Sequence, residues 1–279
     1  MNAFSTRRAF RGHAPRRLAG LLLSLLCGCA AAQTAWLFGE RHDQLDQQRQ
    51  VAAEVQRLAQ QGRLHALVVE MAERGRHTAG LPKHSSEAQV RDALGWHDKA
   101  WPWSQYRDVV MHAVQAGRPV YGGDLPRPAL REAMGQTHWD RAVPPPAHAR
   151  LIEAVREGHC GLLPEAHLPG MVRMQLARDR SLAETLRDAS AGAARDRVTV
   201  MLSGAVHASR GTGVPLQLDN VAPGLVVRTI VFAAAGAETR TGFDETRPAR
   251  LTPTKSDPCD ALRRKAVPAA PPASGAASS

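Results

Sequence analysis

Five short, continuous apolar runs constrain the fold of this chain more than any other feature of its sequence. Most of them do not alternate apolar with polar residues, so both faces of each strand are expected to be buried. A sheet that is buried on both faces is normally parallel and is flanked by helices. The sequence therefore predicts an α/β fold with a mainly parallel sheet. The expected strands are Ala35–Phe38, Ala66–Glu70, Pro119–Gly122, Val198–Ser203 and Leu225–Phe232.

The segments between these runs differ in character along the chain. Asp43–Gln61 and Tyr106–Ala116 carry apolar residues at helical spacing, and a glycine follows each of them. Residues 126–190 contain no strand-like run and predict a smaller helical lobe inserted between the third and fourth strands. Residues 236–279 are rich in Pro, Ala, Ser and Arg, which predicts a disordered tail. The folded domain is expected to span residues 29–235.

The N-terminal stretch has the pattern of an export signal. It is basic without an acidic residue, and the apolar run LAGLLLSLL follows. This run is too short to cross a membrane, which takes about 20 apolar residues. Residues 1–28 are therefore predicted to be a secretory signal peptide. The sequence LCGC is similar to a bacterial lipobox, which predicts lipidation of Cys29 and a periplasm-facing lipoprotein of the outer membrane. The paired arginines in TRRAF leave general secretory and twin-arginine export both open.

Charge and cysteine content restrict the class of protein. The formal net charge is +10, but five basic residues and no acidic residue precede Cys29, so about +5 remains after cleavage. This excess is spread along the chain, which argues against nucleic-acid binding and suits an anionic ligand or membrane surface. Cys160 and Cys259 are too few and too far apart for a zinc ribbon. In an oxidising compartment they either pair or remain free thiols.

Acidic and imidazole side chains gather where the predicted strands end. Glu40 and His42 follow the first strand, Glu70 ends the second, and Asp124 and His207 follow the third and fourth. The carboxyl ends of parallel strands meet at one edge of a sheet, where such folds bind ligands. An acid at the end of a buried run is costly unless it is paired. The sequence therefore predicts a functional site at this edge.

Two acidic residues near this edge also have a structural interpretation. Asp43 precedes a predicted helix and is expected to be its N-cap. Asp124 is a candidate both for the site and for the cap of the next helix. The remaining histidines have no acidic neighbours at strand ends and are interpreted as surface or structural residues.

Five segments occur in an order that resembles a known family. They are LFGERHDQLDQQ, ALVVEM, WPWSQYRDVVMHAVQAGRPVYGGDLPR, MVRMQLARDRSLAETL and MLSGAVHASRGTGVPLQL. Together they are similar to the ChaN-like haem-binding lipoproteins of the Tiki and erythromycin-esterase-like superfamily. The resemblance implies a parallel α/β domain with a helical lobe, in a lipid-anchored outer-membrane protein of haem or iron uptake. It also implies haem binding at a homodimer interface through a tyrosine, with an outer-membrane haem receptor as partner.

Haem requires an axial ligand, an apolar slot and cations for its propionates. The candidate axial ligands and propionate partners lie at or near the strand ends: Tyr106, His42, His207, Arg41, Arg127 and Arg210. The resemblance matches the superfamily's site residues to Glu40, His42, Glu70 and His207. Where the family usually has asparagine, this chain has Asp124, which adds a negative charge to the pocket.

An enzyme is the alternative hypothesis, although a binding protein is favoured. Histidines and carboxylates on one rim would bind a divalent metal and activate water, as in a metal-dependent hydrolase or metalloprotease. The candidate metal ligands are Glu40, His42, Glu70, Asp124 and His207. In that case Glu40 would be a general base. No nucleophile elbow is evident in the sequence. A third hypothesis is a lipid-tethered scaffold with a vestigial site.

Overall fold

The computed structural model describes residue 1 and residues 33–253, 259–260 and 263–264. Apart from residue 1, the predicted signal peptide and the lipobox with Cys29 lie outside the described residues, as do residues 254–258, 261–262 and 265–279 of the predicted tail. Within the described part of the chain, no helix is long and apolar enough to cross a membrane.

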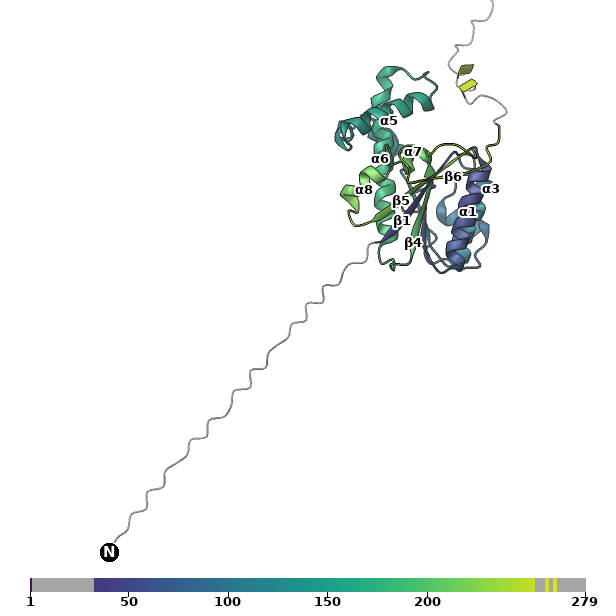
Figure 1. Cartoon of the computed structure of the whole chain (residues 1–279), viewed down its shortest axis with the longest axis vertical. Coiled ribbons are helices and arrows are strands. Elements are labelled where there is room, and N and C mark those ends of the chain that lie inside the picture. The colour runs from purple at the N-terminus through teal and green to yellow at the C-terminus, as the bar shows by residue number, and fades with distance from the viewer. Residues whose placement is uncertain (2–32, 254–258, 261–262, 265–279) are drawn as a thin grey trace, which may run out of the picture. The chain divides into compact units, whose positions relative to one another are not determined.

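A six-stranded sheet forms the centre of the domain, and all of its strands run parallel (Figure 1). The strand order is β3-β2-β4-β1-β5-β6, so β1 and β4 are central neighbours. The predicted α/β fold with a mainly parallel sheet is confirmed, and all five predicted strands are present. The strands are β1 (Thr34–Glu40), β2 (Leu64–Glu73), β3 (Val120–Asp124), β4 (Val198–Gly204), β5 (Val226–Ala233) and β6 (Glu245–Pro248).

Helices cover both faces of the sheet, which explains why the strands are continuously apolar. Phe38 and Leu67 belong to a core that includes side chains of α1, α2 and α3. Leu37 and Val68 point to the opposite face, where they join a core with α6 and α8. The helices around the sheet are α1 (Leu45–Gln60), α2 (Glu87–Leu94), α3 (Trp103–Gln115), α6 (Leu168–Ser190) and α8 (Pro215–Val221).

Two element boundaries near the site differ from the sequence predictions. β2 does not end at Glu70 but continues to Glu73, with a register shift between Val69 and Glu73 in its pairing with β3. The prediction that Asp43 caps the first helix is wrong. The N-cap residue of α1 is Gln44, without a side-chain cap, and the carboxylate of Asp43 instead pairs with Arg41 at 3.1 Å.

Between β3 and β4, all regular secondary structure is helical. These elements have a core of their own, in which Leu151 and Val155 of α5 pack with Val172 and Leu176 of α6. The C-terminal half of α6 continues onto the sheet. The elements before α6 are α4 (Arg127–Gly135), the 3-10 helix η1 (Thr137–Arg141), α5 (Pro145–Gly158) and the 3-10 helix η2 (Glu165–His167).

The chain after β5 is more ordered than its composition indicates, so a tail boundary at residue 236 is too early. β6 adds to the sheet as an edge strand, a position that tolerates proline and charged residues. Beyond it, the backbone N–H groups of Arg250 and Thr252 donate to side chains of Asp46 and Gln44 on or next to α1. Composition missed this because hydrogen bonds hold much of the segment, and only single residues such as Phe243 and Ala249 pack on the apolar cores.

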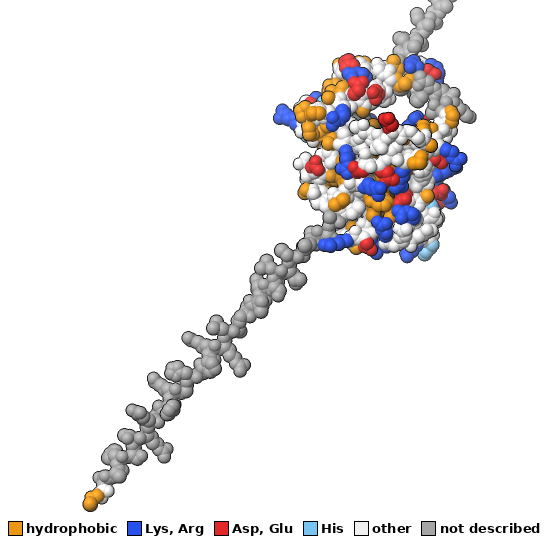
Figure 2. Space-filling model, in the orientation of Figure 1, with side chains coloured by type: hydrophobic (Ala, Val, Ile, Leu, Met, Phe, Trp, Pro, Cys, Tyr) orange, Lys and Arg blue, Asp and Glu red, His pale blue; other side chains and the backbone are white. Residues whose placement is uncertain are grey.

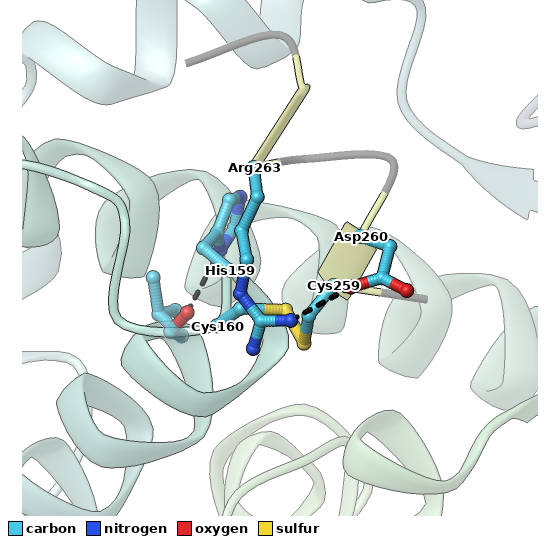
Figure 3. The surroundings of a disulfide bond; sticks show 6 residues. His159, Cys160, Cys259, Asp260 and Arg263 are labelled. Atoms are coloured by element: carbon cyan, nitrogen blue, oxygen red, sulfur yellow. Dashed lines mark hydrogen bonds and ion pairs between the residues drawn. A yellow bond between two sulfur atoms is a disulfide. The ribbon is translucent and has the colours of Figure 1, made fainter. Parts of the chain in front are cut away.

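A disulfide joins the C-terminal segment to the helical lobe. Cys160, two residues after α5, is bonded to Cys259 (Figure 3). The two cysteines therefore pair, and the alternative of free thiols does not hold. Such a bond fits a protein of an oxidising compartment.

Candidate functional site

The strand order places a topological switch point between β1 and β4. The chain leaves β1 toward β2 and leaves β4 toward β5, on opposite sides of the sheet, so the ends of these neighbouring strands open a crevice. A cavity of about 760 Å³ lies here, lined by the strand ends, α7 (Ala205–Ala208), α5 and α6. Cofactor and small-molecule sites typically measure about 300–1,000 Å³. The carboxyl edge of the sheet therefore holds a ligand-sized cavity.

Glu40, the last residue of β1, orients His42 at the wall of this cavity. Its buried carboxylate accepts hydrogen bonds from His42 Nδ1 (2.8 Å) and the Tyr106 hydroxyl (2.9 Å), and Gln48 donates to its other oxygen. Burial alone would lower the pKa of His42, but the hydrogen bond to Glu40 and the charge of Glu70 outweigh it and raise that pKa. Nε2 is the nitrogen that remains for a ligand.

Glu70 is the carboxylate at the centre of the site. Its Oε2 accepts the N–H of Gly204 at 2.7 Å, and its Oε1 lies 3.5 Å from His207 Nε2 and 3.6 Å from an Arg178 nitrogen. Burial would raise the pKa of Glu70, but the charges of His207, His42 and Arg178 lower it. A Cβ at Gly204 would lie 3.1 Å from His42 Nε2 and 3.6 Å from Glu70 Oε2. Glycine therefore keeps the space beside both groups open.

His207, in α7, is held by an aspartate that the sequence analysis missed. Its Nδ1 donates to Asp179 Oδ1 at 2.6 Å, and both side chains are buried. Burial raises the pKa of Asp179 to about 6. Burial would lower the pKa of His207, but the charges of Glu70 and Asp179 outweigh it and raise that pKa. His207 therefore repeats the arrangement of His42, with Nδ1 on a carboxylate and Nε2 on the side of Glu70.

Arg178 connects the site to a second cavity at the ends of β2 and β3. Its Nε donates to Asp124 Oδ1 at 2.7 Å, and this pairing, not a helix cap, is the main role of Asp124. Burial raises the pKa of Asp124, against the opposing charge of Arg178. The second cavity measures about 410 Å³ and shares Glu70, Trp101 and Arg178 with the first. Arg127 lines this second cavity and not the first.

The two other predicted propionate partners are separated by the fold. Arg41 lines the first cavity, with a half-exposed side chain paired to Asp43. Arg210 forms an ion pair with Asp244 at 2.7 Å and donates to a backbone carbonyl of β5, away from the cavity. Arg210 therefore does not line this cavity, because the end of β4 turns into α7 before the chain reaches it.

Tyr106 contacts Glu40 from the protein interior and does not line the cavity. Its side chain, on α3, is fully buried, and its hydroxyl donates to Glu40. Burial and the neighbouring charge of Glu40 raise its pKa well above the ordinary value. Tyrosine ligates haem iron as a phenolate, so the structure does not support Tyr106 as the axial ligand.

Asp179 left a signal in the sequence that could have identified it. Leu176 and Ala183 belong to the buried stripe of α6. Asp179 lies three residues after the first and four before the second, on the same stripe. A charged residue at a buried helical position requires a partner, and His207 is that partner.

The divalent-metal hypothesis has no support in this geometry. Among the residues that the structure describes, no group of three or more His, Cys, Asp or Glu side chains is placed to hold a metal ion. The predicted set fails because its carboxylates are already engaged. Glu40 holds His42, and Arg178 lies against both Glu70 and Asp124.

Fold and site together define a class of protein: a parallel α/β ligand-binding domain whose cavity lies between the sheet edge and a helical lobe. The chain belongs to the haem-binding uptake family of ChaN, in the Tiki superfamily, whose family model matches residues 28–218. The resemblance seen in the five sequence segments is therefore confirmed.

One solved structure supports the shared fold. It is described as cofacial haem binding to ChaN of Campylobacter jejuni, and it aligns with a TM-score of 0.60 and 20% identity, over 75% of this chain and 84% of that chain. The type III effector HopBA1 aligns with a TM-score of 0.41 and 17% identity, over 79% of this chain and 91% of that chain, which is too distant to support an inference. No curated protein matches the chain.

Proposed function

We propose that the protein binds haem in the cavity between the sheet edge and the helical lobe, and that it serves bacterial haem or iron uptake. Membership of the haem-binding uptake family supports this proposal. The observation that carries it is His42, whose Nδ1 is held by Glu40 at the wall of a cavity of about 760 Å³. An imidazole bonded to a carboxylate through one nitrogen is well oriented to bind a metal through the other.

The lining of the cavity fits a large, mainly apolar cofactor. Leu151, Ala154 and Val155 form one wall on α5, and Val206 on α7 is 40% exposed. The ring of Trp101 packs edge-on against His42, with ring centroids 4.7 Å apart. These residues supply the apolar slot that haem needs, and haem itself supplies an iron with an open axial position.

Two residues complete the proposed haem site. Arg41, at the exposed edge of the cavity, is the cation available to a propionate. His207 is the second candidate axial ligand, but its side chain is only 7% exposed and lies against Glu70, so His42 is preferred.

A haemin titration tests the proposal. Haemin added to the purified protein should give a saturable shift of the Soret band, and His42→Ala should weaken the binding by more than the about 10- to 100-fold that loss of a ligand's hydrogen-bond partner costs. His84→Ala is the matched control, because His84 is exposed and outside the cavity. Equal affinity in wild type, His42→Ala and His84→Ala would remove His42 from the site, and no shift at stoichiometric haemin would refute haem binding itself.

The proposed setting is the outer membrane, facing the periplasm, with the protein anchored by a lipid on Cys29. The sequence LCGC after a basic, apolar leader supports the anchor. Family resemblance also supports a homodimer and an outer-membrane haem receptor as partner. Mass spectrometry of the mature N-terminus should find a lipidated Cys29, and Cys29→Ser should abolish the modification. Size-exclusion chromatography with and without haemin tests the homodimer. Co-purification from outer-membrane extracts tests the haem receptor as a partner.

A metal-independent hydrolase is the second candidate function. It is favoured by two imidazoles, each held by a carboxylate, on either side of Glu70. His42 would act as the general base through Nε2. Hydrolysis of a model ester that is lost in both His42→Ala and His207→Ala, but kept in His84→Ala, would support it, whereas no turnover in the wild type would count against it.

A further inference from the structure

Three arginines lie at corresponding positions before three neighbouring strands. Arg63 directly precedes β2, Arg197 directly precedes β4, and Arg118 lies two residues before β3. Because these strands are parallel and adjacent, their first residues lie along one edge of the sheet. That edge is opposite to the one that holds the cavity. The fold therefore collects these cations at the amino end of the sheet.

Contacts show that these side chains form one basic face, which we define as Arg63, Lys83, Arg118 and Arg197. Arg63 donates to the carbonyl of Asp196, the residue before Arg197. The Lys83 side chain lies over Gly117, the residue before Arg118. Burial and then the charge of Arg197 lower the pKa of Arg118. The guanidinium groups of Arg118 and Arg197 therefore repel each other.

The basic face is not neutralised by ion pairs within the described part of the chain. None of its four cations forms an ion pair with a described acidic residue. Asp196 is the acidic residue beside it. Arginine and lysine side chains are visible along the lower end of the domain in Figure 2, the end at which the described chain begins with Gln33. A cluster of cations without counter-ions attracts anionic partners.

The chain enters the domain at this same edge, because β1 begins at Thr34. Cys29 precedes Thr34 by five residues, a length that spans at most about 17 Å. A lipid on Cys29, as proposed above, would therefore keep the basic face near the membrane surface. The cavity lies at the other end of the strands, which rise about 3.3 Å per residue. It would therefore be separated from the membrane by the length of the sheet and face away from it.

We propose that the basic face docks on anionic phospholipid headgroups and orients the anchored domain with its cavity toward the periplasm. Lipid phosphates attract the arginine and lysine side chains. Each basic residue near the surface raises the partitioning of the protein onto the membrane about fivefold. The inference rests on the lipid anchor for the orientation, but the face itself is a property of the folded domain.

Vesicle binding by the chain that begins at Ala31 tests the proposal. This chain lacks Cys29 and retains the elements and the three apolar cores described above, all of which lie within residues 34–249. It should bind phosphatidylcholine vesicles that contain phosphatidylglycerol at low salt, and pure phosphatidylcholine vesicles much less. Replacing Arg63, Arg118 and Arg197 by glutamine should lower the partitioning about 100-fold. The matched control replaces Arg131, Arg141 and Arg240, which are exposed and make no described ion pair.

The triple replacement of the same three arginines by lysine separates charge from folding. It should bind like the wild type, because the charge is kept. Equal losses in the glutamine variant and its control, loss in the lysine variant, or no preference for phosphatidylglycerol would each overturn the proposal. Binding to heparin without binding to vesicles would assign the face to an acidic macromolecule and also overturn it. An unlipidated Cys29 would refute the anchor but leave this measurement unchanged.

Discussion

Replacing Glu40 by glutamine should weaken haem binding while leaving the fold intact. The carboxylate accepts hydrogen bonds from His42, Tyr106 and Gln48. Glutamine keeps the shape and one acceptor oxygen. Its new NH₂ group can be satisfied if the amide of Gln48 rotates, because Gln48 Oε1 has no partner in the described structure. We therefore expect a loss of only about 1 kcal/mol in the free energy of unfolding.

The larger effect of Glu40→Gln falls on His42. A hydrogen bond to a charged group contributes about 1.5–3 kcal/mol, and one pKa unit corresponds to about 1.4 kcal/mol. The pKa of His42 should therefore fall, and an NMR titration of the ligand-free protein measures this. Loss of the carboxylate that orients a metal-binding imidazole lowers affinity about 10- to 100-fold, so the haemin dissociation constant should rise by that factor.

The pH dependence of stability provides an independent check on the same interaction. The pKa of His42 is raised in the folded protein. Its stabilising contribution is therefore present below the unfolded value of about 6.5 and is lost as pH rises through the folded value. Glu40→Gln should accordingly destabilise the protein more below pH ~6 than above pH ~8, as measured by urea denaturation. Glu238→Gln, an exposed control, should show neither effect.

The reasoning would be refuted if the pKa of His42 fell as expected but haemin bound with unchanged affinity. In that case the imidazole would be oriented by Glu40 without being a ligand, and His42 would lose its place in the proposed haem site.

Three further substitutions probe the neighbourhood of the site. Tyr106→Phe should leave the Soret band in place, because the hydroxyl serves Glu40 and not the iron, and should cost about 1 kcal/mol in urea denaturation. Gly213→Ala would place a Cβ 2.1 Å from the His207 carbonyl oxygen, so thermal denaturation should show a loss of about 2 kcal/mol or more. Cys259→Ser opens a disulfide of sequence separation 99, for which chain entropy gives about 4–5 kcal/mol; reduced wild type should lose the same amount.

The sequence predicted the sheet and much of the cavity wall for the same physical reason. Continuous apolar runs show which segments are buried on both faces, and parallel strands align their ends. Glu40, His42, Glu70 and His207 therefore meet as their positions predicted. Asp124 was placed at the correct edge, but its partner Arg178 was unknown, so its pairing was not predicted.

Residues outside the strands were harder to place, because their positions depend on how the helices pack. Arg210 follows β4 by only a few residues, yet the turn of α7 directs it to Asp244. Tyr106 faces inward because it lies three and four residues before Val109 and Val110, on the stripe of α3 that packs on the sheet. β6 was missed because an edge strand with proline and arginine resembles a linker in composition.

α6 belongs both to the helical lobe and to the site at the sheet edge, so the two parts depend on each other. Its N-terminal half packs against α5, where Leu176 belongs to the lobe core, and its C-terminal half packs on the sheet through Leu182. Between these halves, Arg178 lies against the carboxylates at the ends of β2 and β3, and Asp179 holds His207. Removing one partner of a buried ion pair costs about 3–5 kcal/mol. The acidic edge of the sheet is therefore stable only while the lobe holds α6 in place. A ligand that contacts α5 and the strand ends together must stabilise both, so ligand binding and lobe packing are thermodynamically linked.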